Sequence, residues 1–165
     1  MTPTGNWLIQ LDGSEFKVMR LQDAARPEHT GDTPETIVAH LRSQLANSIA
    51  YNPDTESLMV VLLNARRKII GWQIIATGTL DTLLFHPREV FKPAIICNAQ
   101  ALVLAHNHPS GDPGPSEADV KMTRDMIRAG QLLRIEVLDH IILGACSSER
   151  AKSYSSMREL GYFYA

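Results

Sequence analysis

The chain has 165 residues, of which 44% are hydrophobic and 21% charged, and its formal net charge is −2 at pH 7. This composition is typical of a globular domain that buries its own core, and it argues against a disordered chain. The nearly balanced charge offers no broad basic surface for nucleic acid. No apolar run approaches the roughly 18 residues of a membrane span, and no leader sequence follows Met1. We therefore expect no membrane association and a cytoplasmic location.

The first 31 residues are predicted to be an N-terminal extension made of a hairpin and a linker. Residues 7–11 and 16–19 have the composition of short strands, and the Asp12-Gly13 pair between them favours a tight turn. The polar residues 26–32 indicate a linker. The main domain is placed at residues 32–165, and the extension contains no residues that indicate chemistry.

A helix is predicted at the start of the main domain. Pro34 suits the first helical position, and Asp32 or Thr33 can cap the helix. Apolar residues then recur at helical spacing over residues 37–49.

Two strands are predicted to follow this helix. The continuous apolar run at residues 58–63 indicates a strand buried on both faces, and residues 69–76 indicate a second strand that returns beside it. The basic turn between them, residues 66–68, is typical of a solvated hairpin tip, with phosphate contact as the alternative.

Helices and strands continue to alternate in the second half of the chain. His86 and Pro87 begin a helix that has Pro93 inside it, where we expect a kink. Three further elements are predicted: a short buried strand at residues 101–105, a helix at residues 116–129 closed by Gly130, and a core strand at residues 135–143. The alternation predicts a single α/β domain with a mixed β-sheet flanked by helices.

The two cysteines, Cys97 and Cys146, lie far apart in the sequence and have apolar neighbours. This pattern is typical of free, buried thiols in a reducing compartment. One disulfide between them is the alternative.

The strongest chemical signal lies between His106 and Asp119. Residues two apart on a strand project from the same face, so His106 and His108 can clamp a metal ion together. The Pro- and Gly-rich loop at residues 109–115 can bring Asp119, at the start of the next helix, back to the strand end. Two histidines and one carboxylate leave a fourth tetrahedral position for water, as in catalytic zinc sites. The alternative for Asp119 is a capping box with Ser116.

A metal-activated water needs a general base, and Glu56 at the head of the strand at residues 58–63 is our candidate. Glu35 and Glu89 are less well placed, on predicted helices. Ser116 can donate a hydrogen bond to a developing oxyanion, cap the helix, or do both. His140, beside Asp139, is interpreted as a strand histidine satisfied by its neighbours, with a supporting role behind the metal ligands as the alternative.

The string from His106 to Asp119, H-N-H-P-S-G-D-P-G-P-S-x-x-D, closely resembles the JAMM metalloprotease motif of JAB/MPN domains in the form found in RadC-like proteins. Residues 86–94 and 138–144 are similar to the same branch, so the resemblance extends from about Thr33 to the C-terminus. Asn107 differs from the residue common in eukaryotic JAMM enzymes, and a deubiquitinase substrate is therefore not carried over. A helix-hairpin-helix segment, frequent in longer relatives, is not apparent.

The resemblance implies an MPN-type α/β fold in which His106, His108 and Asp119 hold one zinc ion. It also implies a glutamate base, placed at Glu56, and a serine near the oxyanion, matched by Ser116. Manganese or iron could occupy the same ligands.

We therefore predict a zinc-dependent hydrolase of amide or isopeptide bonds that acts on a protein or peptide substrate. A DNA-repair-associated or nuclease role is one alternative, which a basic groove would favour. A metal-binding interaction module without turnover is the other.

Overall fold

The structure, a computed structural model, describes residues 6–12, 15–21, 30–78, 86–148 and 151–164. The helices within these ranges are α1 (Pro34–Leu45), α2 (Pro87–Ile96) and α3 (Glu117–Leu133). The strands are β1 (Asn6–Asp12), β2 (Glu15–Leu21), β3 (Ser57–Leu63), β4 (Ile69–Thr77), β5 (Ala101–Asn107), β6 (Glu136–Leu143) and β7 (Tyr154–Ser156).

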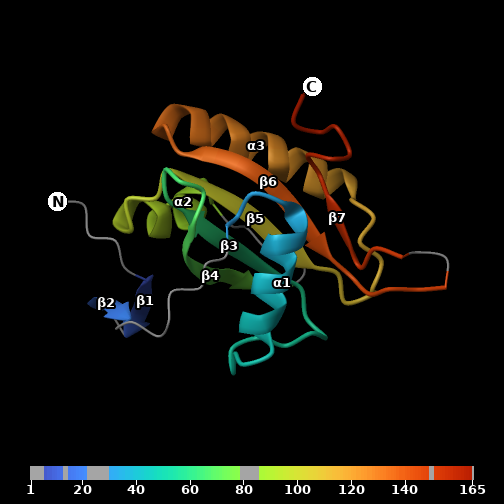
Figure 1. The fold of residues 1–165 in the computed structure, drawn as a ribbon, viewed down its shortest axis with the longest axis horizontal. Helices are drawn as coiled ribbons and strands as arrows, with labels where there is room; N and C mark the ends of the chain where they lie inside the picture. Colours follow the sequence, from blue (N-terminus) through green and yellow to red (C-terminus); the bar gives the residue numbers. More distant parts are fainter. Residues whose placement is uncertain (1–5, 13–14, 22–29, 79–85, 149–150, 165) are drawn as a thin grey trace.

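A five-stranded sheet in the order β4-β3-β5-β6-β7 runs through the middle of the molecule (Figure 1). β5 and β6 pair in parallel, and the other neighbouring pairs are antiparallel. The parallel pair requires a crossover connection, which α3 provides. The predicted α/β fold with one mixed sheet is therefore confirmed.

Both faces of the sheet are covered, because side chains alternate between two helical layers. All seven residues of β3 and all seven of β5 are buried, which confirms the prediction of a strand without a polar face. The odd-numbered apolar residues of the two strands pack with α1: Met59, Val61, Leu63, Ala101, Val103 and Ala105. The even-numbered ones pack with α2 and α3: Leu58, Val60, Leu62, Leu102 and Leu104.

The predicted start of α1 is correct, and Thr33 is its cap. The Thr33 side chain accepts from the Thr36 N–H, and Pro34 occupies the first helical turn. The start of α2 is likewise as predicted, with His86 as cap, and the helix continues through Pro93.

Three predicted boundaries were wrong. The helix expected to reach Ile49 ends earlier, because α1 stops at Leu45 and the Ile49 side chain is fully exposed. Gly130 does not close α3, which continues to Leu133 and ends at Arg134 in the left-handed conformation (φ 58°). A Cβ at Gly130 would lie 2.5 Å from the Ile135 carbonyl oxygen, so this glycine permits close packing of the helix end and does not act as a cap. The strand predicted at residues 101–105 extends two residues further, to Asn107, so His106 lies within the sheet.

The predicted N-terminal hairpin is present as a separate two-stranded sheet. β1 and β2 pair antiparallel from Asn6 and Leu21 to Asp12 and Glu15. The turn residues 13–14 and most of the predicted linker lie outside the described residues. Of the linker, Gly31 donates its N–H to the Arg67 carbonyl oxygen at 2.7 Å, which attaches it to the β3–β4 turn.

Cys97 and Cys146 are both free, as predicted. Cys97 is half-buried, but the expected burial of Cys146 is wrong, because this residue lies in the exposed segment beyond the end of β6. None of the helices in the described ranges is both long and apolar enough to cross a bilayer.

The loop between β5 and α3 is attached to the end of β6. The His108 N–H donates to the Leu143 carbonyl oxygen, and the Ala145 N–H donates to the Gly111 carbonyl oxygen, both at 2.9 Å. A Cβ on Gly144 would lie 2.5 Å from the Gly111 carbonyl oxygen and 2.7 Å from Pro113 Cδ. The conformation of the loop that connects the predicted ligands therefore depends on a glycine at position 144.

Gly144→Ala should destabilise the protein by about 1–3 kcal/mol, because the methyl group must displace backbone atoms of the ligand loop. Chemical unfolding of the metal-free protein measures this change. Gly114→Ala in the same loop is the matched control, since its Cβ would meet only the Asp112 side chain, at 3.3 Å. Equal stability losses in the two variants would contradict this account of Gly144.

Candidate metal centre

Two imidazole rings meet at the C-terminal end of β5. His106 pairs in register with Leu58 of β3 and Ile142 of β6, which places it in the centre of the sheet. As an even-numbered residue it continues the series of side chains that faces α3. His108 follows just beyond the strand, and its Nε2 lies 2.9 Å from His106 Nε2.

The Asp119 carboxylate faces both rings from the first turn of α3. Its Oδ1 lies 3.2 Å from His106 Nε2, and its Oδ2 lies 3.6 Å from His108 Nε2. Asp119 is 0% exposed, and Oδ1 has no hydrogen-bond partner within the described part of the chain. A buried carboxylate oxygen that receives no proton is costly unless a cation neutralises it.

These separations fit a single divalent ion. Tetrahedral zinc with ligand bonds of about 2.0–2.2 Å implies about 3.3 Å between ligand atoms. The three distances among His106, His108 and Asp119 are 2.9, 3.2 and 3.6 Å, which bracket this value. The structure thus brings the three predicted ligands together around one point.

Glu56, the residue immediately before β3, faces the same two imidazoles. Its Oε1 is 3.7 Å from His108 Nε2 and 4.0 Å from His106 Nε2, and its side chain is 14% exposed. Glu56, His106 and His108 also form a group whose ligand atoms lie within 4.8 Å of one another and could hold a metal ion. We favour Asp119 as the third ligand because it is closer, fully buried and has the unpaired oxygen.

Asn107, between the two histidines, holds the backbone on both sides of Glu56. Its side-chain oxygen accepts from the Ser57 N–H at 2.9 Å, and its amide nitrogen donates to the Thr55 carbonyl oxygen at 3.0 Å. The partners determine the orientation of the amide, since an N–H can only donate and a carbonyl can only accept. The strand that carries the ligands therefore also positions the candidate base.

Ser116 is the N-cap of α3, and it forms a capping box with Asp119. Both its hydroxyl and its N–H donate to Asp119 Oδ2, each at 2.7 Å, and the Asp119 N–H donates back to the hydroxyl oxygen at 3.2 Å. The two interpretations of Asp119 are thus compatible, because Oδ2 serves the cap while Oδ1 faces His106. Donation by Ser116 to an oxyanion stays a prediction.

The other two glutamates considered as bases have different roles. Glu35 accepts a hydrogen bond from the Tyr154 hydroxyl and lies 3.5 Å from Lys152 Nζ. The Tyr154 hydrogen bond lowers the pKa of Glu35 to about 2. Glu89 belongs to the capping box of α2. Of the three candidates, Glu56 is therefore the one that faces the histidines.

His140 lies directly behind His106. Its Nε2 is 2.8 Å from His106 Nδ1, and its Nδ1 is 2.7 Å from the Thr123 hydroxyl. Burial lowers the pKa of His140 well below its usual value. His140 is thus satisfied by its neighbours, as expected, and one of those neighbours is a candidate ligand. Sequence reasoning missed Thr123, for which the only signal is its position one helical turn after Asp119.

The surroundings of the site favour an ionised Asp119 carboxylate next to a protonated His108 ring. A hydrogen bond to Asp119 raises the pKa of His108, although desolvation opposes this shift. Burial raises the pKa of Asp119, but the adjacent His106 and His108 rings outweigh it and hold this pKa below its usual range.

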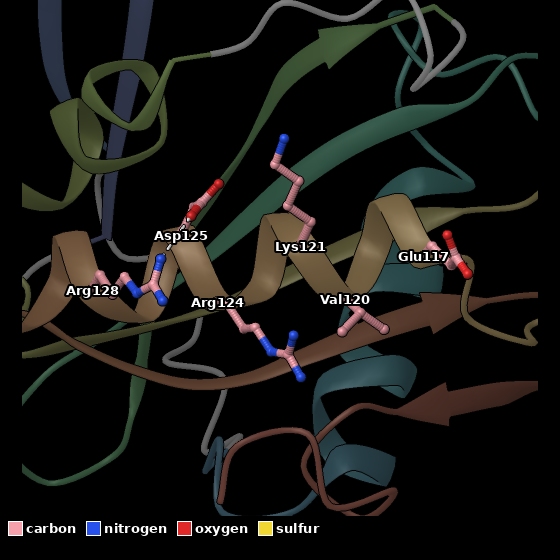
Figure 2. Close-up of a pocket in the computed structure, with 6 residues that line it drawn as sticks. All are labelled: Glu117, Val120, Lys121, Arg124, Asp125 and Arg128. Carbon is pink, nitrogen blue, oxygen red and sulfur yellow. Dashed lines mark ion pairs between the residues drawn. The ribbon is translucent and has the colours of Figure 1, made fainter. Parts of the chain in front are cut away.

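The exposed face of α3 offers no comparable convergence of groups. Figure 2 shows a surface hollow there, lined by side chains of this one helix: Glu117, Val120, Lys121, Arg124, Asp125 and Arg128. Lys121 and Arg124 point in opposite directions, and Arg128 pairs with Asp125 at 3.6 Å. These cations are interspersed with acidic residues and do not form a continuous basic patch.

The basic turn between β3 and β4 lies at the far end of the sheet from the site. β3 has seven residues, which at about 3.3 Å each separate this turn from Glu56 by roughly 20 Å. Arg67 in the turn pairs with Glu136 at 2.9 Å. The turn is therefore not placed to deliver a ligand to the histidines.

Comparison with known proteins identifies relatives of the chain. Residues 32–162 match the family model described as the RadC-like JAB domain. A UPF0758 protein of Symbiobacterium thermophilum is 48% identical over 106 residues, which are 64% of this chain and 43% of that protein. A UPF0758 protein of Rubrobacter xylanophilus is 44% identical over 129 residues, which are 78% of this chain and 52% of that protein. The chain spans about half the length of these curated relatives.

Asp119→Asn should lower the pKa of His108 in the metal-free protein, because a neutral amide no longer stabilises the imidazolium. Titration of the ring protons by NMR, after chelator treatment, measures this pKa. Asp125→Asn on the same helix is the control and should leave the pKa of His108 unchanged. A pKa that stays the same or rises in Asp119→Asn would show that the two groups are not coupled.

Proposed function

The chain belongs to the RadC-like JAB domain family, and from this premise we propose that it is a zinc-dependent hydrolase of amide or isopeptide bonds. The observation that carries the proposal is the convergence of His106, His108 and Asp119, with a buried Asp119 oxygen that has no hydrogen-bond partner among the described residues. Such an oxygen beside two imidazoles is better explained by a role in binding a cation than by a role in packing.

His106, His108 and Asp119 are proposed to hold the ion. Zinc bound by three protein ligands would act as a Lewis acid that polarises a carbonyl group and activates water at neutral pH. The three donors are two imidazole nitrogens and one carboxylate oxygen, which suit zinc, although manganese and iron accept the same set.

Glu56 is proposed as the general base. Its carboxylate is farther from both imidazole nitrogens than that of Asp119 is, and its side chain is partly exposed, so it can accept a proton from the attacking water. The same carboxyl group then returns the proton to the leaving amine. Asn107 supports this role because its side chain hydrogen-bonds to the backbone of Thr55 and Ser57, the residues on either side of Glu56.

Ser116 is proposed to have two roles in succession. In the structure its hydroxyl donates to Asp119 Oδ2, which orients the carboxylate. Because its N–H also donates to that oxygen, the hydroxyl can turn to a developing oxyanion while the carboxylate stays held.

We propose a protein or peptide substrate. The mixed charges on α3 and the remote position of the basic β3–β4 turn do not favour nucleic acid as the substrate. A cytoplasmic location is proposed as well, and the two free cysteines are consistent with a reducing compartment.

Glu56→Gln should retain zinc but lose at least about 100-fold in hydrolysis of a peptide and isopeptide library, because it removes the proton acceptor. Elemental analysis measures zinc, which should be near one ion per chain in wild type and Glu56→Gln and absent from His108→Ala. Glu89→Gln, in the α2 cap, is the matched control and should retain both zinc and activity.

Three outcomes decide among the functions. Loss of hydrolysis in Glu56→Gln with retained zinc supports the hydrolase. Zinc binding without hydrolysis of any library member would instead support a metal-binding interaction module. Wild-type protein that takes up no divalent metal would overturn the proposal.

A further inference from the structure

Three buried groups extend from the candidate ligand His106 into the core between β6 and α3. They are the rings of His106 and His140 and the hydroxyl of Thr123, all 0% exposed. His106 Nδ1 lies 2.8 Å from His140 Nε2, and His140 Nδ1 lies 2.7 Å from Thr123 Oγ1. Each contact is a hydrogen bond, so the direction of each proton can be derived.

Thr123 determines the first direction. Its hydroxyl donates to the Asp119 carbonyl oxygen, one helical turn earlier, at 2.6 Å. A hydroxyl has one proton to donate, so the Thr123 oxygen must accept at its contact with His140. The proton between them therefore belongs to His140 Nδ1.

His140 determines the second direction. A charged imidazolium, fully buried between a hydroxyl and another imidazole, would be costly, so the His140 ring is neutral. A neutral imidazole that is protonated on Nδ1 has a lone pair on Nε2. His140 Nε2 is therefore the acceptor, and His106 Nδ1 is the donor.

This proton on Nδ1 leaves the lone pair of His106 on Nε2, the atom that faces Asp119 and His108. Neutral His108 also has its lone pair on Nε2, because its Nδ1 lies 2.6 Å from the Asp112 carbonyl oxygen, which can only accept. Two lone pairs and one carboxylate oxygen then point at one place, which is the arrangement a divalent cation requires.

We infer that Thr123 and His140 are positioning residues that, within the zinc site proposed above, hold His106 as the tautomer that binds metal. Without them, the competing tautomer carries its proton on Nε2, 3.2 Å from the unpaired Asp119 Oδ1. A hydrogen bond between those two atoms would occupy both groups that the ion needs.

Zinc affinity, measured on the whole chain by competition with a chromophoric chelator, tests this role. His140→Leu removes the acceptor for His106 Nδ1 and should weaken zinc binding by about 10–100-fold. Thr123→Val keeps the side-chain size and removes the hydroxyl, so it should weaken binding in the same direction. Thr123→Ser retains the hydroxyl, and His140→Gln replaces the acceptor nitrogen by an amide oxygen. These two variants should therefore bind zinc more tightly than Thr123→Val and His140→Leu, respectively.

Nitrogen NMR of the histidine rings in metal-free protein, at mildly alkaline pH, provides a readout that does not depend on zinc or activity. His106 should carry its proton on Nδ1 in the wild type and shift it towards Nε2 in His140→Leu. Val137→Ala, a buried change on the same strand, is the control for lost packing and should alter neither readout.

If His140→Leu does not fold, Thr123→Val decides, because valine fills the same space. Wild-type zinc affinity in both variants, or a metal-free wild type with His106 protonated on Nε2, would overturn the inference. Wild-type protein that binds no zinc would overturn the proposed function instead, and the ring spectra would still decide the tautomer.

Discussion

The buried carboxylate of Asp119 is the constraint on which the arrangement of the site depends. One oxygen receives two hydrogen bonds from Ser116, and the other lies unpaired beside His106. Removing such a charge from water costs several kcal/mol, which partners of opposite charge must offset. The two imidazoles, together with the proposed ion, would satisfy this requirement, and neither the cap nor the apolar packing of α3 does so.

The sheet register brings the remaining groups to this carboxylate. β5 lies between β3 and β6, so the end that carries His106 has a neighbouring strand on each side. Glu56 lies just before β3, and Asn107 of β5 hydrogen-bonds to the backbone of its neighbours Thr55 and Ser57. β6 contributes His140, which lies behind His106. The loop from β5 to α3 then brings Asp119, in the first turn of α3, back to the same strand end. One strand end thus serves as the meeting point of four segments.

Hydrogen bonds on the far side of the two histidine rings determine where each ring carries its proton. A backbone carbonyl sets the proton of His108, and a buried chain through His140 and Thr123 sets that of His106. Binding of the proposed ion would therefore cost little entropy in ligand orientation, because these hydrogen bonds already hold both rings. Membership in the RadC-like JAB domain family agrees with such a centre.

Local patterns predicted most of the elements well. The apolar run of β3, the cap of α1 and the start of α2 depend on neighbouring residues, and all were read correctly. Gly130 was misread because its role is a close approach to Ile135, a contact that a local pattern does not contain. The short strand β7 was not predicted, since its three residues form a strand only by pairing with β6.

By itself the sequence determined the alternating α/β order and the H-x-H spacing with a later carboxylate, because periodicity and spacing are local properties. Only the tertiary structure decided which of three glutamates faces the histidines, and that Asp119 serves as cap and metal-facing group at once. It also decided that His140 and Thr123 stand behind His106. These relations join residues up to 52 positions apart, as for Glu56 and His108, through strand register and helix packing, which no local spacing encodes.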